Sequence, residues 1–246
     1  MQLLYVSCRI LVLCNHSALR QQLSNTTMER RNAMFTIYGY NSFNGIKVLL
    51  TAEELGLDYD YVHVELGKGE QKKPEYLQRH PYGKIPALEH DGHRLVESAS
   101  ICRYLANIND HRMYSADPLQ AARIDQTIDM MVLHVGRWLG VYFWQEVICK
   151  KFFKKTPDAE LIAEAEGFLK AHLPYFDHLL EENVFLCGSE VTIADTIAYA
   201  MFQVHEQTSA DISAYPNILR WYGEFSERPS VAAVKARLEK QGSMLG

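Results

Sequence analysis

Short alternating runs of hydrophobic and polar residues come first along the folded part of the chain, and helical spacing dominates later. The runs Phe35 to Tyr38 and Tyr59 to Val64 have the aromatic and β-branched character of strands. Between them, apolar residues recur at helical spacing from Ile46 to Leu55, and Gly56 follows as a helix-ending residue. The pattern therefore predicts a strand, an amphipathic helix and a second strand.

Four further elements complete this first unit. Pro74 to Gln78 predicts a short helix, and two antiparallel strands flank a turn at His90-Asp91-Gly92. A last helix carries its apolar residues on one face, from Ile101 to Ile108. The resulting order, βαβαββα, is that of a thioredoxin-like α/β domain, which we assign to residues 34–110.

The second half of the chain predicts helices only. Asp117-Pro118 and Thr156-Pro157 each place an N-cap residue before a proline at the first helical position. Thr192, with Asp195 three residues later, is close to a capping box, and we expect both residues to be structural. The fold class is thus an α/β N-terminal thioredoxin-like domain plus an all-α C-terminal helical domain, with a linker at 111–117 and the helical domain at 118–246.

The first 33 residues differ in composition from the rest. They carry four arginines against one acid, Glu29, a net charge of +3 that leaves −8 for the remainder. Their apolar part is short, contains Arg9 and lacks a preceding basic region, so it matches a secretory signal poorly. We expect residues 1–33 to be a disordered leader or an unused upstream start, with Met34 standing just before the first strand.

Composition excludes several classes of function. The 246 residues are 48% hydrophobic, and the net charge of −5 argues against a general nucleic-acid binder. No apolar run approaches the roughly 20 residues needed to span a bilayer. Five cysteines without paired spacing indicate a reducing, cytoplasmic environment rather than a disulfide framework. Since no metal-binding motif occurs either, we expect no metal, no nucleic-acid partner and no membrane partner.

The stretch from Pro81 to Leu88 and its continuation at Glu97-Ser98 carry the first candidate chemistry. Ile85 precedes a proline, which favours an extended backbone and permits a cis bond, so its backbone can pair with a peptide-like ligand. Ser98 lies where a helix begins, a position that binds anions, and Glu97 supplies a charge for an ammonium. Adjacent anion and cation sites suit the zwitterionic end of an amino acid.

These residues, HPYGKIPAL followed by VESASICRYL, resemble the glutathione-binding core of cytosolic glutathione transferases, NP-x-GK-V/I-P-A-L followed by E-S-x-x-I-x-x-Y-L. The resemblance covers about residues 34 to 240, with His80 replacing the usual asparagine. It implies glutathione as co-substrate, held by Lys84, Ile85, Glu97 and Ser98. The pattern is similar to bacterial, serine-type members with a phi-, theta- or nu-like glutathione site. A surface lysine beside a turn is the alternative interpretation of Lys84.

Ser42 and Asn44 lie in the loop between the first strand and the first helix. Hydrogen-bond donors at that helix N-terminus favour a thiolate, and because no Cys-x-x-Cys occurs there, a bound ligand would supply the sulfur. The run SFNGIK also resembles the TPNGHK of the nu class, whose Thr and Asn contact the glutathione sulfur, and Ser42 matches the catalytic serine of the phi and theta kinds. The resemblance therefore assigns catalysis to Ser42 and Asn44. Alternatively both are cap and turn residues, or Tyr40 is the donor.

Two further groups of residues complete the candidate site. Residues 69–77, GEQKKPEYL, resemble the phi-type segment GEHKxPEFL, which places Gln71 and Lys72 at the glycine end of glutathione; the alternative is a solvated loop. Trp138 and Tyr142, one turn apart on an aromatic helix, are candidates for the electrophile pocket together with Tyr40, and core or dimer packing is the alternative.

The resemblance implies a homodimeric enzyme that conjugates the thiolate of glutathione to hydrophobic electrophiles. Two alternatives stay open. One is a glutathione-dependent disulfide oxidoreductase or peroxidase of the nu kind. The other is a non-enzymatic glutathione-binding, ligand-binding or interaction module on the same fold.

Overall fold

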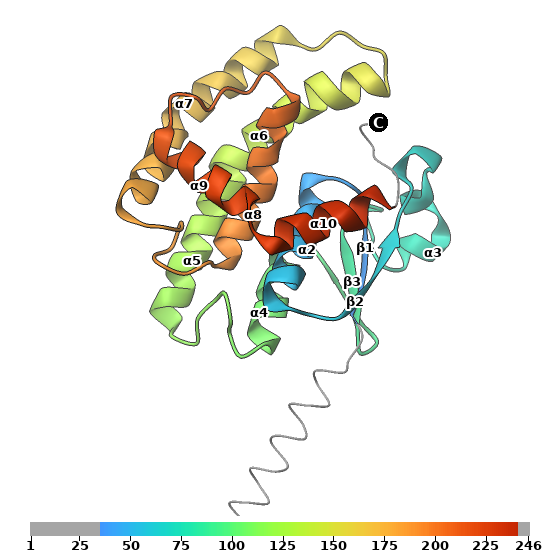
Figure 1. The fold of residues 1–246 in the computed structure, drawn as a ribbon. Coiled ribbons are helices and arrows are strands. Elements are labelled where there is room, and N and C mark those ends of the chain that lie inside the picture. The colour runs from blue at the N-terminus through green and yellow to red at the C-terminus, as the bar shows by residue number, and fades with distance from the viewer. Residues whose placement is uncertain (1–34, 241–246) are drawn as a thin grey trace, which may run out of the picture.

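A four-stranded mixed sheet forms the centre of the N-terminal domain in the computed structural model, which describes residues 35–240 (Figure 1). Strand β1 pairs in parallel with β2 and antiparallel with β3, and β3 pairs antiparallel with β4. The middle of the sheet is fully buried, because Ile37 and Leu88 lie opposite each other and both are 0% exposed. The strands are β1 (Phe35–Gly39), β2 (Tyr59–His63), β3 (Ala87–His90) and β4 (His93–Val96).

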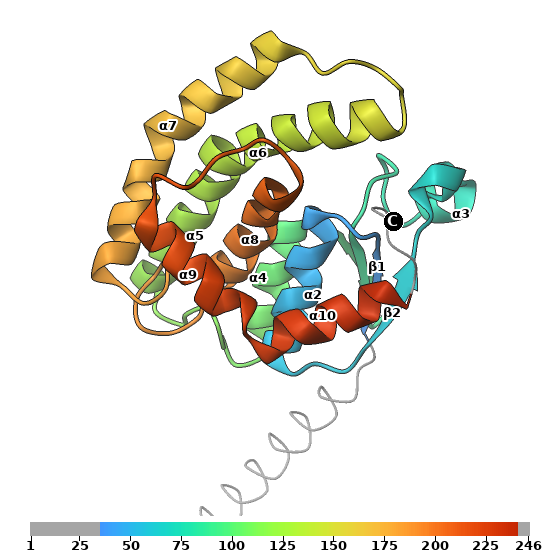
Figure 2. The same cartoon turned by 45° about the horizontal axis from the view of Figure 1, so that its top comes forward.

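Two helices lie between this sheet and the helical domain (Figures 1 and 2). They are α2 (Phe43–Leu55) and α4 (Ser98–Ile108). Helix α2 ends at Gly56, whose φ of 67° allows the left-handed cap that a side chain would disfavour. The short α3 (Pro74–Leu77) and the 3₁₀ turns η1 (Leu66–Lys68) and η2 (Glu70–Lys72) connect β2 to β3.

A long helical rod opens the second domain. It consists of α5 (Pro118–Met130), the π-helical turn η3 (Met131–Gly136), α6 (Arg137–Tyr142) and a second π-helical turn, η4 (Phe143–Cys149). Helix α7 (Ala159–Glu182) returns beside the rod, and α8 (Ile193–Phe202) is buried along its whole length. The chain closes with η5 (Gln203–Gln207), α9 (Pro216–Ser226) and α10 (Pro229–Glu239), and α10 crosses back to pack on α2 (Figure 2).

Helix α2 joins the two domains through buried polar contacts. The hydroxyls of Thr51 on α2 and Thr196 on α8 lie 2.8 Å apart and are fully buried. The Glu54 carboxylate accepts two hydrogen bonds from the Arg228 guanidinium, at 2.6 and 2.7 Å, and a third from Ser230 at 2.6 Å. Because a bidentate pair fixes direction as well as distance, these contacts hold α10 in register with α2.

The expected fold class is confirmed, including the element order βαβαββα. The capping box is also present: the buried Asp195 carboxylate accepts from the Thr192 backbone N–H and hydroxyl, each at 2.9 Å. The predicted cap at Thr156-Pro157 is wrong by two residues, since Asp158 caps α7 by accepting from the backbone of the first turn. The prediction of a leader at 1–33 lies outside the described residues.

Candidate functional site

The loop after β1 presents Ser42 as the N-cap of α2. Its backbone N–H donates to the Tyr40 carbonyl at 2.8 Å, which closes a tight turn. The Ser42 hydroxyl oxygen accepts from the Gly45 backbone N–H at a long 3.4 Å. This weak cap bond uses an acceptor lone pair, so the hydroxyl hydrogen remains available to donate to a ligand at the helix N-terminus.

Gly45 is required by the close approach of this turn to the helix. A Cβ atom built on Gly45 would lie 2.5 Å from the Tyr40 carbonyl oxygen, far inside van der Waals contact. That oxygen also accepts the Ser42 N–H and cannot move without disturbing the turn. A side chain at this position would therefore displace Ser42.

A hydrogen bond from Lys47, which belongs to the same helix, orients the side chain of Asn44. The Lys47 ammonium donates to the Asn44 Oδ1 at 2.8 Å. Because this bond occupies the carbonyl end of the amide, the Asn44 NH₂ group is the end left to donate outward, beside Ser42. In the sequence Lys47 belongs to the SFNGIK run, where its i,i+3 spacing from Asn44 is the one signal of this contact.

Lys47 is a buried cation beneath the site, with 2% of its surface exposed. Burial lowers its pKa to about 8, and Cys102 and the Glu97 carboxylate oppose that shift. The ammonium is therefore mostly charged at neutral pH, and the negative charge of Glu97 favours that charged form. Burial also raises the pKa of Cys102 to about 11, so this thiol is a neutral core group rather than a nucleophile.

Glu97 and Ser98 stand at the junction of β4 and α4. Glu97 has a φ of +68°, a left-handed conformation unusual for a residue with a side chain, and its side chain is exposed. Ser98 is the first residue of α4, so the free backbone N–H groups of that helix end lie beside its hydroxyl. The two residues therefore offer a carboxylate and an anion-binding helix end next to each other.

The turn before β3 has the geometry that the sequence suggested. The Ile85–Pro86 bond is cis, and within the described residues no hydrogen bond engages the Ile85 backbone. Gly83 is needed here, since its φ is +55° and a Cβ would lie 2.4 Å from the Gln71 carbonyl. This contact, with the Lys72 ammonium donating to the Tyr82 carbonyl at 2.8 Å, packs the 70–72 turn against residues 82–84.

His80 is a buried residue whose pKa responds to several charged side chains of the candidate site. Its ring is buried and accepts the Tyr82 backbone N–H at Nδ1, 3.3 Å away, so it supports the turn where the family has asparagine. Burial lowers the pKa of His80; Glu97 opposes this shift, while Lys84 and Lys72 add to it. The charges of Lys72, Lys84 and Glu97 therefore all act on the His80 ring.

A depression beside Ser42 has aromatic walls from both domains. Phe43 and Phe143 pack edge to face there, with ring centroids 5.6 Å apart. Phe143 and the polar residues of η5 were not predicted for the site, because no local sequence pattern marks them. The depression is lined by Asn41, Ser42, Phe43, Ile46, Phe143, Ala200, Gln203, Val204 and Gln207.

The structure places the three residues predicted for the electrophile pocket in buried positions. Trp138 is 9% exposed and stacks on Phe168 at 4.2 Å between the rod and α7, and Tyr142 is buried with 3% exposed. Tyr40 is also buried, its ring centroid lies 5.0 Å from that of His63, and burial together with the nearby Glu65 carboxylate raises its pKa. None of the three lines the depression at Ser42.

This combination defines a class: a thioredoxin-like domain that carries a capped helix N-terminus, a cis-proline turn and a Glu-Ser junction, followed by an all-helical domain. Residues 33–107 match the family description "Glutathione S-transferase, N-terminal domain", and residues 136–229 match "Glutathione S-transferase, C-terminal domain". The chain belongs to the glutathione S-transferase family.

Plant enzymes are among the similar proteins. Glutathione S-transferase F12 of Arabidopsis thaliana is 31% identical over 190 residues, covering 75% of this chain and 88% of the relative. The crystal structure of glutathione transferase F2 from Populus trichocarpa matches with a TM-score of 0.78 at 29% identity, over 84% of this chain and 99% of that chain. Glutathione S-transferase I from maize, in complex with an atrazine glutathione conjugate, matches with a TM-score of 0.76 at 28% identity, over 83% and 98%.

Proposed function

We propose that this protein conjugates glutathione to hydrophobic electrophiles and that Ser42 and Asn44 ionise the glutathione thiol. The observation that carries the proposal is the pair of donors at the start of α2, with the Asn44 amide fixed by Lys47 at 2.8 Å. Donors and a positive helix end favour a thiolate over a thiol, because both interact better with the charged form.

The other predicted residues fit the remainder of glutathione. The Glu97 carboxylate would pair with the α-ammonium, and the start of α4 at Ser98 with the α-carboxylate. The unused Ile85 backbone would bond the peptide, and Lys84 with Lys72 and Gln71 would face the glycine carboxylate. Each of these contacts binds or orients, and none changes its covalent state.

Bound glutathione supplies the reacting sulfur: its thiolate forms a carbon–sulfur bond while the leaving group departs with its electron pair, and the thiol proton goes to solvent. The aromatic walls at Phe43 and Phe143 suit an apolar electrophile at that position. The conjugate present in the maize structure supports this reaction class. A homodimer and a cytoplasmic location are parts of the same proposal, supported by family membership.

The test is an ultraviolet titration of glutathione bound to the parent, Ser42→Ala and Asn44→Ala. We expect a thiolate band in the parent well below the pKa of free glutathione, displaced to higher pH in both variants. Ser189→Ala, at an exposed loop position of the helical domain, is the matched control and should leave the band unchanged. Glutathione binding with an unshifted thiol in the parent would refute thiol activation by this loop.

A further inference from the structure

The turn between η4 and α7 carries an exposed basic and aromatic sequence that the transferase site does not use. Residues 150–155 read KKFFKK, and all six are exposed, with Phe152 at 48% and Phe153 at 55%. Trp144, two turns earlier on the rod, is 51% exposed and packs 5.9 Å from the Phe153 ring. We call Trp144 and residues 150–155 the basic aromatic turn.

The four lysines of this turn are not neutralised by the protein. Within residues 35–240, none of their ammonium groups forms an ion pair or hydrogen bond. Two acids close in sequence are engaged elsewhere: Glu146 accepts from Ser209 at 2.6 and 2.7 Å, and Asp158 caps α7. A local charge of +4 therefore stands out on a chain whose net charge is −5, a feature that sequence analysis overlooked.

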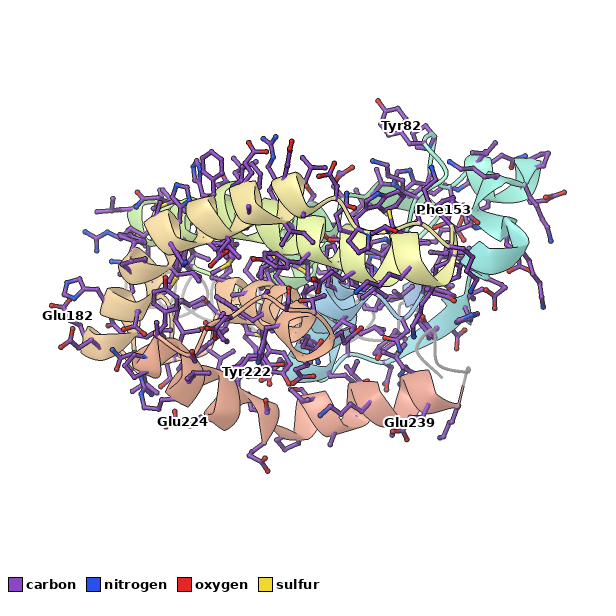
Figure 3. The ribbon with its side chains drawn as sticks, turned by 90° about the horizontal axis from the view of Figure 1, so that it is seen from above. Tyr82, Phe153, Glu182, Tyr222, Glu224 and Glu239 are labelled. Atoms are coloured by element: carbon purple, nitrogen blue, oxygen red, sulfur yellow. The ribbon has the colours of Figure 1, made fainter. Side chains whose placement is uncertain are left out.

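The backbone holds these side chains together in one ordered turn. The Phe152 N–H donates to the Ile148 carbonyl at 3.0 Å, and the Lys155 N–H donates to the Cys149 carbonyl at 3.0 Å. Lys154 reverses the chain with a φ of +53°. The turn forms an outer end of the helical domain, where the rod gives way to α7 (Figures 1 and 2), and Phe153 is labelled there in Figure 3.

We propose that the basic aromatic turn binds the surface of an anionic lipid bilayer. Aromatic rings favour the interfacial layer of a membrane, and each lysine near an anionic surface adds electrostatic attraction. Two adjacent phenylalanines between two lysine pairs supply both terms in a protruding turn, whereas single-strand nucleic-acid binding favours a charged groove. This proposal departs from the expectation of no membrane partner.

The proposed association is peripheral. Within the part of the chain that the structure describes, no helix is both long and apolar enough to cross a membrane. The turn would place the enzyme beside apolar compounds dissolved in the bilayer without occupying the site at Ser42. The proposal does not depend on the transferase reaction, because none of its residues belongs to that site.

Vesicle cosedimentation of the full chain tests it. We expect binding to phosphatidylcholine vesicles that contain phosphatidylserine, little binding to phosphatidylcholine alone, and release by added salt. The double variants Lys154→Gln/Lys155→Gln and Phe152→Ser/Phe153→Ser should each weaken binding about tenfold or more. Transfer to a small soluble electrophile should stay at the parent rate in both.

Matched controls use exposed residues elsewhere. Lys68→Gln/Lys240→Gln removes the same charge, and Leu119→Ser/Val184→Ser removes exposed apolar side chains (60% and 50%). Both controls should bind vesicles as the parent does. Absence of binding to phosphatidylserine vesicles at low salt would overturn the proposal. Two other results would also overturn it in favour of an electrostatic surface. One is equal vesicle binding by the Phe152→Ser/Phe153→Ser variant. The other is tighter binding to an oligonucleotide than to vesicles.

Discussion

The Lys47 ammonium lies 2.8 Å from the Asn44 side-chain oxygen, and one helical turn of α2 thereby contains both a buried charge and the amide that the charge orients. A lysine near the positive end of a helix and shielded from water is unfavourable for folding. Its position beneath the proposed sulfur site suggests that stability is given up for electrostatic support of a thiolate.

Lys47→Met should separate these two effects. We expect the free energy of unfolding at pH 7 to rise by about 1–3 kcal/mol, because a buried charge is replaced by an apolar side chain. We expect the pKa of bound glutathione to rise by about one unit, because the cation and the orientation of Asn44 are both lost. In a double-mutant cycle with Asn44→Ala, the effects on thiol pKa should be less than additive. Additive effects would show that Lys47 acts without Asn44.

The same residue predicts a pH dependence of stability. Folding lowers the pKa of Lys47 from 10.5 to about 8, so between these values the unfolded chain binds more protons than the folded one. The contribution of Lys47 to the free energy of unfolding must therefore rise with pH across that window. Chemical denaturation from pH 7.5 to 10.5 should show this rise in the parent and a smaller one in Lys47→Met. Parallel curves would contradict it.

Gly45→Ala should reduce activity by displacing Ser42. The added Cβ would meet the Tyr40 carbonyl at 2.5 Å, so the turn must open. Gly140→Ala is the control, because a Cβ there meets nothing within 4 Å and alanine favours the helix. We expect kcat/KM to fall by at least about tenfold in the first variant, a loss of about 1.4 kcal/mol in transition-state stabilisation. Equal activities would show that the turn tolerates the methyl group.

Phe143→Ala should weaken the binding of an aromatic electrophile. Its ring lines the depression at Ser42 and packs on Phe43, and an aromatic contact of this kind contributes about 0.5–1.5 kcal/mol. We expect KM for the electrophile to rise about three- to tenfold, with the thiol pKa unchanged. Trp138→Phe, in the packed interior between rod and α7, should leave KM at the parent value. A larger rise in KM for Trp138→Phe than for Phe143→Ala would instead place Trp138 in the electrophile pocket.

At pH values above the acidic range, Glu54→Gln should destabilise the contact between the two domains. Burial opposes ionisation of Glu54, but hydrogen bonds from Arg228 and Ser230 outweigh it and lower its pKa below 4.5. The ionised form therefore adds stability above that value and loses it as the pH falls through the folded pKa. We expect a cost of about 1–3 kcal/mol at pH 7 that shrinks in acid. Glu224→Gln, in an exposed pair, should cost little.

Local signals in the sequence were sufficient where one segment builds a feature by itself. The Thr192–Asp195 cap, the Gly56 helix end and the Glu97-Ser98 junction are of this kind. Phe143 could not be found in this way, because its place depends on the phase of a rod that contains π-helical turns on either side of α6. Trp138 and Tyr142 follow regular helical spacing yet lie on the interior face. Gln203 lines the same depression as Ser42 only because the two domains pack together.

Helix α2 packs against α4, α8 and α10, and its N-cap residue, Ser42, lies at the proposed sulfur site. The loop that we propose to activate the thiol is therefore attached to a helix that contacts both domains. Directed evolution toward new electrophiles should accumulate changes on the rod at Phe143 and on η5 more readily than on α10. Changes on α10 would move α2. They would therefore alter the ionisation of the glutathione thiol, which every electrophile requires.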